Sequence, residues 1–150
     1  MADAGITAWD SKRHYFFWRA GHSHSGGEQR REPANRRRPA LAAVNQYPPY
    51  PDYTSGANNV TGAATGILAL FFGTDRLTFS PTSAAPQVLQ KTRTYDRFSD
   101  LAQDVLDVRI YEGIHFRFAD TGARRQGRLV TRWAFRHFLR PVNNDHNDVH

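Results

Sequence analysis

Two pairs of residues, far apart in the sequence, carry groups that bind a tetrahedral oxyanion. Lys12 and Arg19 are seven residues apart, which places two cations on roughly the same face of a helix. Ser55 and Gly56 stand where a helix is expected to begin. Free backbone N–H groups and the helix dipole favour an anion at such a position. Both pairs predict a site for phosphate or an anion of similar shape.

A third pair, Arg109 and His115, combines a guanidinium fork with an imidazole across a helix end. Each of the three pairs alone also has an ordinary structural explanation. Two cations on a helix are usually solvated, and a Ser-Gly dipeptide before a helix is usually a cap. A histidine among aromatic residues is more often part of a core than a nucleophile. The prediction of an anion site therefore depends on the three pairs occurring together.

The pairs fall at the ends of predicted helices. The spacing of apolar residues predicts helices over residues 1–19, 57–72, 95–111 and 121–139. The proline-rich segment 48–56 cannot be helical, and residues 76–94 favour a short extended pair. We therefore predict an all-α helical bundle with one minor extended pair.

The composition describes a globular domain without cysteine chemistry. Hydrophobic residues make up 39 % of the chain and aromatic residues 13 %. The absence of cysteine excludes disulfides, thiolate metal sites and cysteine nucleophiles. The longest apolar stretch, residues 60–72, is too short and too rich in small residues to cross a bilayer. We therefore predict no membrane span in this chain.

The formal net charge of +6 raises the question of nucleic acid binding. The arginine cluster at 30–38 lies in an aperiodic segment, residues 20–46, with Tyr47 and Tyr50 nearby. Basic tracts with aromatic residues bind nucleic acid backbones and bases. Because the cluster is confined to this one segment, we predict no nucleic acid partner. A salt-sensitive DNA complex that is lost on deletion of residues 28–38 would revive that hypothesis.

The order and spacing of the three pairs resemble the motifs of the vanadium-dependent haloperoxidase and type 2 phosphatidic acid phosphatase superfamily. Its motifs are K-x6-R-P, P-S-G-H and S-R-x5-H. The chain carries similar residues at Lys12 and Arg19, at Pro51–Gly56, and at Arg109 and His115. Trp9, three residues before the lysine, looks like the haloperoxidase branch rather than the lipid phosphatases. The resemblance covers the chain except residues 20–46 and implies the active-site portion of a helical bundle.

The resemblance also implies a role for each residue. The groups that would bind vanadate or phosphate are Lys12, Arg19, Ser55, Gly56 and Arg109. His115 would bond to vanadium, or would attack phosphorus as a nucleophile. With vanadate as cofactor the substrates would be peroxide and halide, and in an acid phosphatase-like hydrolase the substrate would be a phosphoester. Family members are often periplasmic or secreted; the oligomeric state stays open.

The proton-transfer residues depart from the family pattern. Ala57 stands where the second motif has a histidine, and one general acid–base group contributes roughly 10²–10⁴-fold to a rate. Asp120, five residues after His115, is predicted to orient that imidazole as a second catalytic residue, although the family's acidic residue is usually four after it. We therefore expect intact anion binding with impaired turnover. A non-catalytic relic is a further alternative.

The boundaries of the domain follow from the same resemblance. Ala20 stands where the first motif has proline. Codons compatible with residues 20–47, read one base later, permit a family-like segment that restores this proline. A frameshift over residues 20–47 is therefore a hypothesis, and independent genomic sequencing with an unaltered frame would contradict it. We expect a partial domain over residues 1–142, because the family has further helices before the lysine motif, and a polar tail over 143–150.

Overall fold

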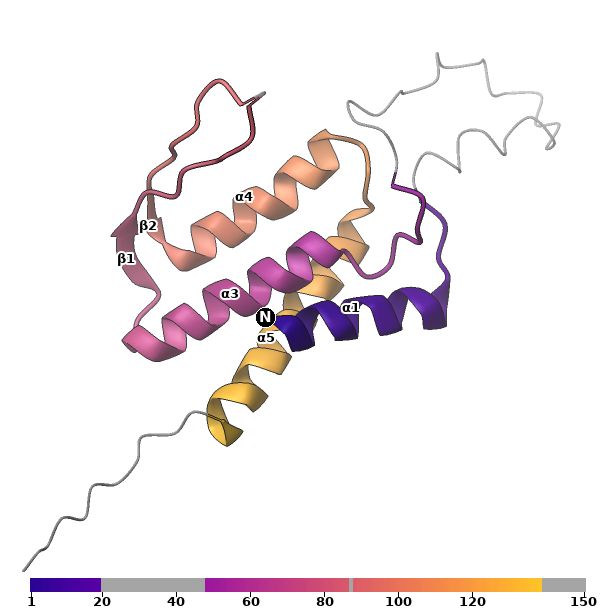
Figure 1. Cartoon of the computed structure of the whole chain (residues 1–150), viewed down its shortest axis with the longest axis horizontal. Helices are drawn as coiled ribbons and strands as arrows, with labels where there is room; N and C mark the ends of the chain where they lie inside the picture. Colours follow the sequence, from indigo (N-terminus) through magenta and orange to yellow (C-terminus); the bar gives the residue numbers. More distant parts are fainter. Residues whose placement is uncertain (20–47, 87, 139–150) are drawn as a thin grey trace, which may run out of the picture.

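The computed structural model describes residues 1–19, 48–86 and 88–138, in which four helices and one pair of short strands form a small bundle (Figure 1). The helices are α1 (Ala2–Tyr15), α3 (Gly56–Phe72), α4 (Phe98–Tyr111) and α5 (Arg117–His137). The strands β1 (Arg76–Phe79) and β2 (Tyr95–Arg97) pair in an antiparallel manner. The predicted all-α bundle with a minor extended pair is confirmed. The frameshift hypothesis and the polar tail concern residues outside the described part.

The first helix is shorter than the sequence predicts. It ends at Tyr15, because Phe16 adopts a left-handed conformation with φ of 45° and its N–H bonds to the carbonyl oxygen of Lys12 at 3.1 Å. Residues 16–19 then leave the helix axis. The spacing predicts that Lys12 and Arg19 share a helical face, and this prediction is wrong. Only Lys12 lies on α1.

Two other helix ends also differ from the prediction. The helix expected over residues 95–111 begins at Phe98, because Tyr95–Arg97 pair with β1 as the strand β2. The last helix begins at Arg117, before the predicted start at residue 121, directly after Phe116 in an extended conformation. In both cases a helix starts where the chain leaves an extended segment, which apolar spacing does not locate.

The caps of α3 follow the sequence closely. Ser55 is the N-cap, and its hydroxyl oxygen accepts a hydrogen bond from the backbone N–H of Asn58 at 3.5 Å. The helix ends at Gly73, whose φ of 67° is left-handed and favours glycine. Ser55 fixes the position of the α3 N-terminus, which is one wall of the candidate site.

Helix α5 crosses behind α3 at close range (Figure 1). Two glycines permit this approach. A Cβ atom on Gly62 would lie 2.7 Å from the carbonyl oxygen of Arg124, and one on Gly127 would lie 2.1 Å from the carbonyl oxygen of Asn59. Both obstacles are backbone atoms, which cannot turn aside as a side chain can. The small residues of α3 that the sequence shows are therefore packing residues.

We expect Gly127→Ala to lower the free energy of unfolding by about 3 kcal/mol, at the upper end of the usual range for overpacking. The reason is the backbone carbonyl at 2.1 Å, which forces α3 and α5 apart. Urea unfolding followed by circular dichroism measures the change. Gly5→Ala on α1 is the matched control, because a Cβ there meets nothing within 4 Å. Equal effects of the two substitutions would contradict the proposed close crossing.

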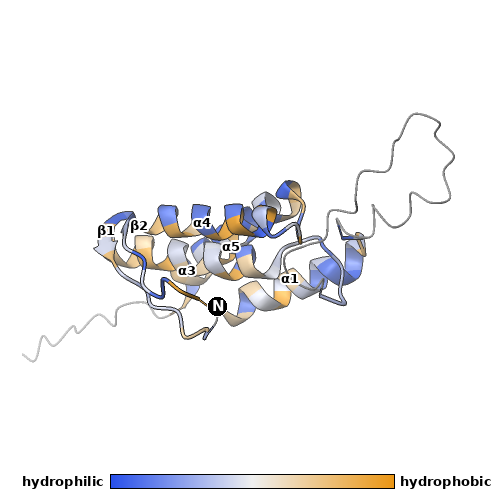
Figure 2. Ribbon diagram, turned by 90° about the horizontal axis from the view of Figure 1, so that it is seen from above, coloured by the Kyte–Doolittle hydropathy of each residue, from blue (hydrophilic) through white to orange (hydrophobic). Residues whose placement is uncertain are grey.

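Large apolar side chains are exposed on the outer surface of the bundle. Hydrophobic stretches lie along each helix when the bundle is seen from above (Figure 2). Large exposed side chains include Ile6, Leu70, Phe71, Leu129 and Trp133, with 39–73 % of their surface accessible.

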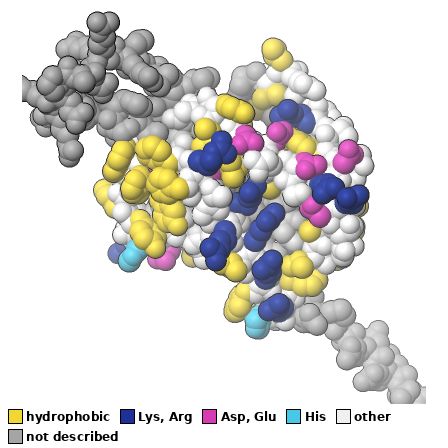
Figure 3. All heavy atoms as spheres, turned by 180° about the vertical axis from the view of Figure 1, so that it is seen from behind, with side chains coloured by type: hydrophobic (Ala, Val, Ile, Leu, Met, Phe, Trp, Pro, Cys, Tyr) yellow, Lys and Arg dark blue, Asp and Glu magenta, His cyan; other side chains and the backbone are white. Residues whose placement is uncertain are grey.

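A second feature of the surface is basic. Helix α5 has exposed arginines, and basic side chains form a row across the face shown in Figure 3. The exposed arginines of α5 include Arg125, Arg128, Arg132 and Arg136.

Candidate functional site

Two buried cations hold the segment that leads into α3. The Nζ atom of Lys12 donates to the carbonyl oxygens of Pro51 and Asp52, at 2.7 and 2.9 Å. The Nε atom of Arg19 donates to the carbonyl oxygen of Tyr50 at 2.7 Å. The two residues are only 2 % and 1 % exposed. The first and second sequence motifs therefore meet in space, and the ordinary explanation of a solvated pair of cations is wrong.

Arg19 also reaches the third motif. Its Nη1 atom donates to the carbonyl oxygen of Ile114 at 2.9 Å, in the turn between α4 and α5. The ring of Tyr50 lies beneath both cations, with its centroid 4.7 Å from the Arg19 Cζ atom and 5.1 Å from the Lys12 Nζ atom. Such cation–π contacts stabilise a cation that has lost much of its water. Arg19 thus connects all three motifs.

His115 faces a carboxylate that the sequence analysis did not select. Its Nδ1 atom lies 2.5 Å from the Oδ1 atom of Asp52, and both residues are buried. The other carboxylate oxygen of Asp52 accepts from the backbone N–H of Phe116 at 3.3 Å. Arg19 Nη1 lies 4.0 Å from the Oδ1 atom. The signal for Asp52 was an acidic residue inside the recognised proline-rich motif, next to Pro51.

The N-terminus of α3 is open on one side. A Cβ atom built on Gly56 would meet nothing within 4 Å, so the space beside this residue is free. Ala57, which replaces the family's histidine, is exposed. Ser55, in contrast, is fully buried, and its backbone N–H donates to the carbonyl oxygen of Ala119 at 3.2 Å. The first turn of α3 therefore offers backbone groups to a ligand without crowding.

Asp120 has a partner that differs from the predicted one. Its Oδ1 atom accepts a hydrogen bond from the side-chain amide of Asn58 at 2.7 Å. Burial raises the pKa of Asp120, while hydrogen bonds from Ser55 and Asn58 and the nearby His115 act in the opposite direction. Asp52 is the carboxylate at the Nδ1 atom of His115, so the orienting role of Asp120 stays a prediction. Asn58, like Asp52, was not selected from the sequence.

Arg109 stands at the C-terminal end of α4. Gly113, with φ of 73°, reverses the chain after this helix and brings His115 back toward it. The Nη1 atom of Arg109 lies 3.3 Å from a carboxylate oxygen of Glu112, and the side chain is 21 % exposed. Its Nε atom is buried and has no hydrogen-bond partner. The guanidinium group of Arg109 therefore contacts Glu112 through Nη1 and has an unpartnered N–H donor at Nε.

The cations of the three motifs influence one another. The pKa of Lys12 is lowered to about 8, first by burial and then by the positive charges of Arg19 and, more weakly, Arg109, against the opposing effect of Asp52. Burial also lowers the pKa of Arg19. Groups that shift one another in this way lie close together, and three cations in one buried region repel each other. An anion between them would relieve that repulsion.

Several of the unpartnered buried polar atoms belong to the residues described above. Among the described residues the side-chain atoms without a hydrogen-bond partner are Arg19 Nη2, Asp52 Oδ1, Asn58 Oδ1, Asn59 Oδ1, Arg109 Nε, His115 Nδ1 and Asp120 Oδ2. The Asp52 and His115 atoms face each other without hydrogen-bond alignment. The nitrogens of Arg19 and Arg109 are donors, and a buried donor without a partner is costly. The oxygens of a bound oxyanion would satisfy both, so the residues present fit such a group.

Aromatic side chains surround one end of the site. Phe17 packs edge-to-face on Phe116 and Phe118, at centroid distances of 6.0 and 5.2 Å, and Trp18 packs on Phe116 at 5.5 Å. Trp18 and Phe118 remain 48 % and 47 % exposed. Hydrophobic side chains gather at the left of the view in Figure 3. Apolar walls of this kind reduce the access of water to the cations and strengthen their electrostatic interactions.

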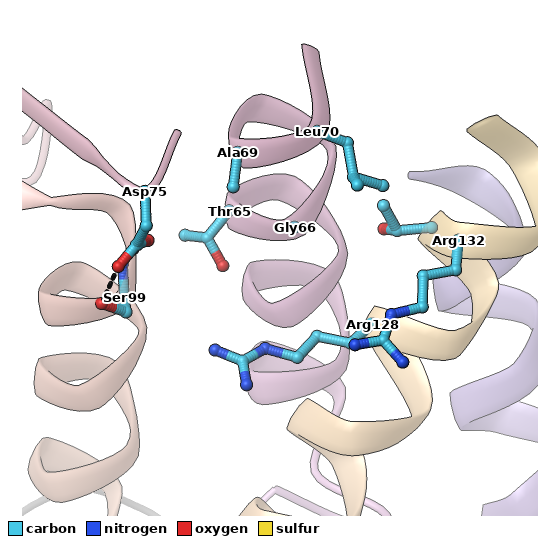
Figure 4. Close-up of a pocket in the computed structure, with 9 residues that line it drawn as sticks. Thr65, Gly66, Ala69, Leu70, Asp75, Ser99, Arg128 and Arg132 are labelled. Atoms are coloured by element: carbon cyan, nitrogen blue, oxygen red, sulfur yellow. Dashed lines mark hydrogen bonds between the residues drawn. The ribbon is translucent and has the colours of Figure 1, made fainter. Parts of the chain in front are cut away.

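A second hollow lies away from these residues, between α3 and α5 (Figure 4). It has a volume of about 240 Å³, and Arg128 and Arg132 of α5 line it. Asp75 and Ser99 lie together on the side opposite Arg132, where a carboxylate oxygen of Asp75 accepts a hydrogen bond from the hydroxyl of Ser99 at 2.5 Å. None of the three sequence motifs contributes to this hollow, so it serves below as the alternative location for an anion.

Two further observations limit the kind of site. Within the described ranges, no three His, Asp or Glu side chains come together in a way that could hold a metal cation. No helix in the part of the chain that the structure describes is long and apolar enough to cross a membrane.

Comparison with known proteins places this arrangement in a family. Residues 1–144 match the family described as the VCPO second helical-bundle domain. The structure of the first bacterial vanadium-dependent iodoperoxidase is 31 % identical, with a TM-score of 0.71 over 90 % of this chain and 30 % of the iodoperoxidase. Apo and holo structures of a bacterial vanadium-dependent chloroperoxidase are 17 % and 19 % identical, with TM-scores of 0.46 and 0.45 over 61 % of this chain and 23 % and 22 % of those chains. No curated protein matches the chain.

The chain belongs to the vanadium haloperoxidase superfamily, in the family of the second helical-bundle domain. The resemblance drawn from the three motifs is confirmed at this level. The chain spans about a third or less of the solved relatives' own length.

Proposed function

We propose that this chain binds vanadate as an oxyanion and contributes a haloperoxidase-type active site. The site, called the oxyanion site below, consists of Lys12, Arg19, Ser55, Gly56, Arg109 and His115. The observation that carries the proposal is the pair of unpartnered guanidinium nitrogens, Arg19 Nη2 and Arg109 Nε, buried next to a third cation. Family membership supports vanadate as the oxyanion.

Each residue has a role that its surroundings support. Lys12, Arg19 and Arg109 neutralise the charge of the anion, and in a site with little water such preorganised cations act strongly. The backbone N–H group of Gly56 in the open first turn of α3 donates to the anion, whereas the N–H group of Ser55 is bonded to Ala119, so Ser55 takes part through its hydroxyl group. His115 would supply an imidazole nitrogen to hold vanadium. Bound vanadate would supply the activation of peroxide for halide oxidation.

The same residues also suit phosphoester hydrolysis, because phosphate and vanadate share charge and shape. His115 would then attack phosphorus, and the phosphorus–oxygen bond of the leaving group would break. The exposed Ala57 favours a third outcome, binding without turnover, because no described residue of α3 replaces the missing histidine as a proton donor. Peroxide-dependent bromination separates the first function from vanadate-inhibited phosphoester hydrolysis, and binding without either reaction supports the third.

Titration calorimetry with orthovanadate tests the binding. We expect saturable binding by the wild type and at least a tenfold loss of affinity in Arg109→Ala and His115→Ala, since each removes a charge or a direct ligand. Arg132→Ala is the matched control, because it removes an exposed arginine that lines the second hollow instead. Binding that Arg132→Ala weakens and Arg109→Ala leaves intact would overturn the proposal.

Vanadate affinity is also expected to depend on pH through Lys12. Because the pKa of this ammonium group is lowered to about 8, the cation is present below that pH and is lost above it. We therefore expect the affinity to fall above pH 8, approaching about tenfold per pH unit. The dissociation constants of wild type and Lys12→Met are compared at each pH, which removes the titration of vanadate itself from the ratio. A ratio that stays constant from pH 7 to pH 10 would contradict a role for the Lys12 charge.

A further inference from the structure

Asp52 holds a central place among the residues of the oxyanion site without being one of them. Its backbone is fixed on both sides, because its N–H donates to the carbonyl oxygen of Phe17 at 2.8 Å and its own carbonyl accepts from Lys12 at 2.9 Å. Its carboxylate is fully buried, with one oxygen held by the N–H of Phe116. The second oxygen has no aligned hydrogen bond and lies 2.5 Å from His115 Nδ1.

The other charged groups around His115 are not placed to take this position. Arg19 lies 4.0 Å from the same carboxylate oxygen, beyond hydrogen-bond distance, and donates to backbone carbonyls instead. The Oδ1 atom of Asp120 accepts from Asn58, and the carboxylate oxygen that pairs with His115 belongs to Asp52, not to Asp120. The Nη1 atom of Arg109 is directed to Glu112. Of the groups around the ring, Asp52 is therefore the acceptor that the Nδ1 position of His115 meets.

We propose that Asp52 is a positioning residue that selects the Nδ1–H tautomer of His115 and so directs the Nε2 lone pair toward the oxyanion. A neutral imidazole has one donor and one acceptor nitrogen, and the hydrogen bond made by one decides the role of the other. A carboxylate against Nδ1 keeps the proton on that atom. The fixed backbone of Asp52 then also fixes the plane of the imidazole ring.

The direction of the Nε2 lone pair toward an oxyanion rests on the proposed oxyanion site, but the choice of the Nδ1–H tautomer does not. A vanadate-free sample therefore tests Asp52 independently. Carboxylate partners of ligating histidines act in this way in metal sites, and their removal typically lowers affinity 10–100-fold. Here the carboxylate comes from the loop before α3, whereas the sequence suggested Asp120 of α5.

The test is nitrogen-15 NMR of histidine-labelled, vanadate-free protein, with the His115 signals assigned by their loss in His115→Ala. The neutral wild-type ring is expected to carry its proton on Nδ1. Asp52→Leu should shift His115 toward the Nε2–H form, because the substitution removes the acceptor that faces Nδ1. Asp120→Asn is the matched control and should leave the tautomer unchanged.

A wild-type His115 in the Nε2–H form would overturn the proposal, even if Asp52→Leu does not fold. An unchanged tautomer in a folded Asp52→Leu would do the same. Vanadate titration of the same samples should show a 10–100-fold loss of affinity in Asp52→Leu. If the Nδ1–H form depends on Asp52 but the wild type binds no vanadate, the positioning role holds and the proposed function fails.

Discussion

Replacing Arg19 by methionine should lower the free energy of unfolding by about 3–5 kcal/mol and abolish vanadate binding. Removing one partner of a buried ionic network leaves the other charges and acceptors without compensation. Here the carbonyl oxygens of Tyr50 and Ile114 lose their donor, and Asp52 loses a neighbouring cation. Methionine retains the length of the side chain, so the effect reports the guanidinium rather than a cavity. Urea unfolding and vanadate titration measure the two losses.

The matched control for this prediction is Arg132→Met. Arg132 is exposed, and its removal is expected to change the free energy of unfolding by less than about 0.5 kcal/mol. If Arg19→Met is as stable as Arg132→Met, Arg19 is not the connection among the three motifs that its contacts indicate. A loss of stability with vanadate affinity fully retained would instead remove Arg19 from the oxyanion site.

Restoring a histidine at position 57 should increase peroxide-dependent bromide oxidation in the presence of vanadate by roughly 10²–10⁴-fold. Ala57 is exposed at the start of α3, next to Ser55 and Gly56, so a larger side chain meets no packed neighbour. An imidazole there could transfer a proton to or from a group bound at the open side of Gly56. The initial rate of bromination of an indicator dye measures the gain.

Ala57→Gln is the control for the histidine substitution, because it adds a polar side chain that cannot titrate. We expect this variant to bind vanadate as the wild type does and to show no gain in rate. Equal rates in the glutamine and histidine variants would mean that proton transfer at position 57 is not the limiting step. An unchanged rate in both, with vanadate bound, would favour the chain as a binding domain without turnover.

The fold was largely predictable where local rules decide it. Ser55 and Gly73 mark the two ends of α3 because a cap and a left-handed glycine are local features. The other boundaries depend on partners distant in the sequence. Residues 95–97 have the composition of a helix start but become a strand, since β1 offers them backbone hydrogen bonds. The left-handed Phe16, which ends α1, has no signal in the apolar pattern.

The sequence predicted only those site residues that the three motifs specify. Lys12, Arg19 and His115 were selected by type and spacing, and the structure brings them to one place through the segment before α3. Asp52 was passed over because nothing in the spacing indicates that the carbonyl and carboxylate of one residue serve both Lys12 and His115. Asn58 was likewise missed, because its bond to Asp120 forms between α3 and α5.

The most direct test of the oxyanion site is a crystal structure of the protein grown with orthovanadate. The ion should lie between the first turn of α3 and His115, with Lys12, Arg19 and Arg109 around it and the Nε2 atom of His115 nearest to vanadium. The second hollow between α3 and α5 offers arginines of equal charge without the three motifs. Vanadate found there, with the space beside Gly56 and His115 free, would contradict the account.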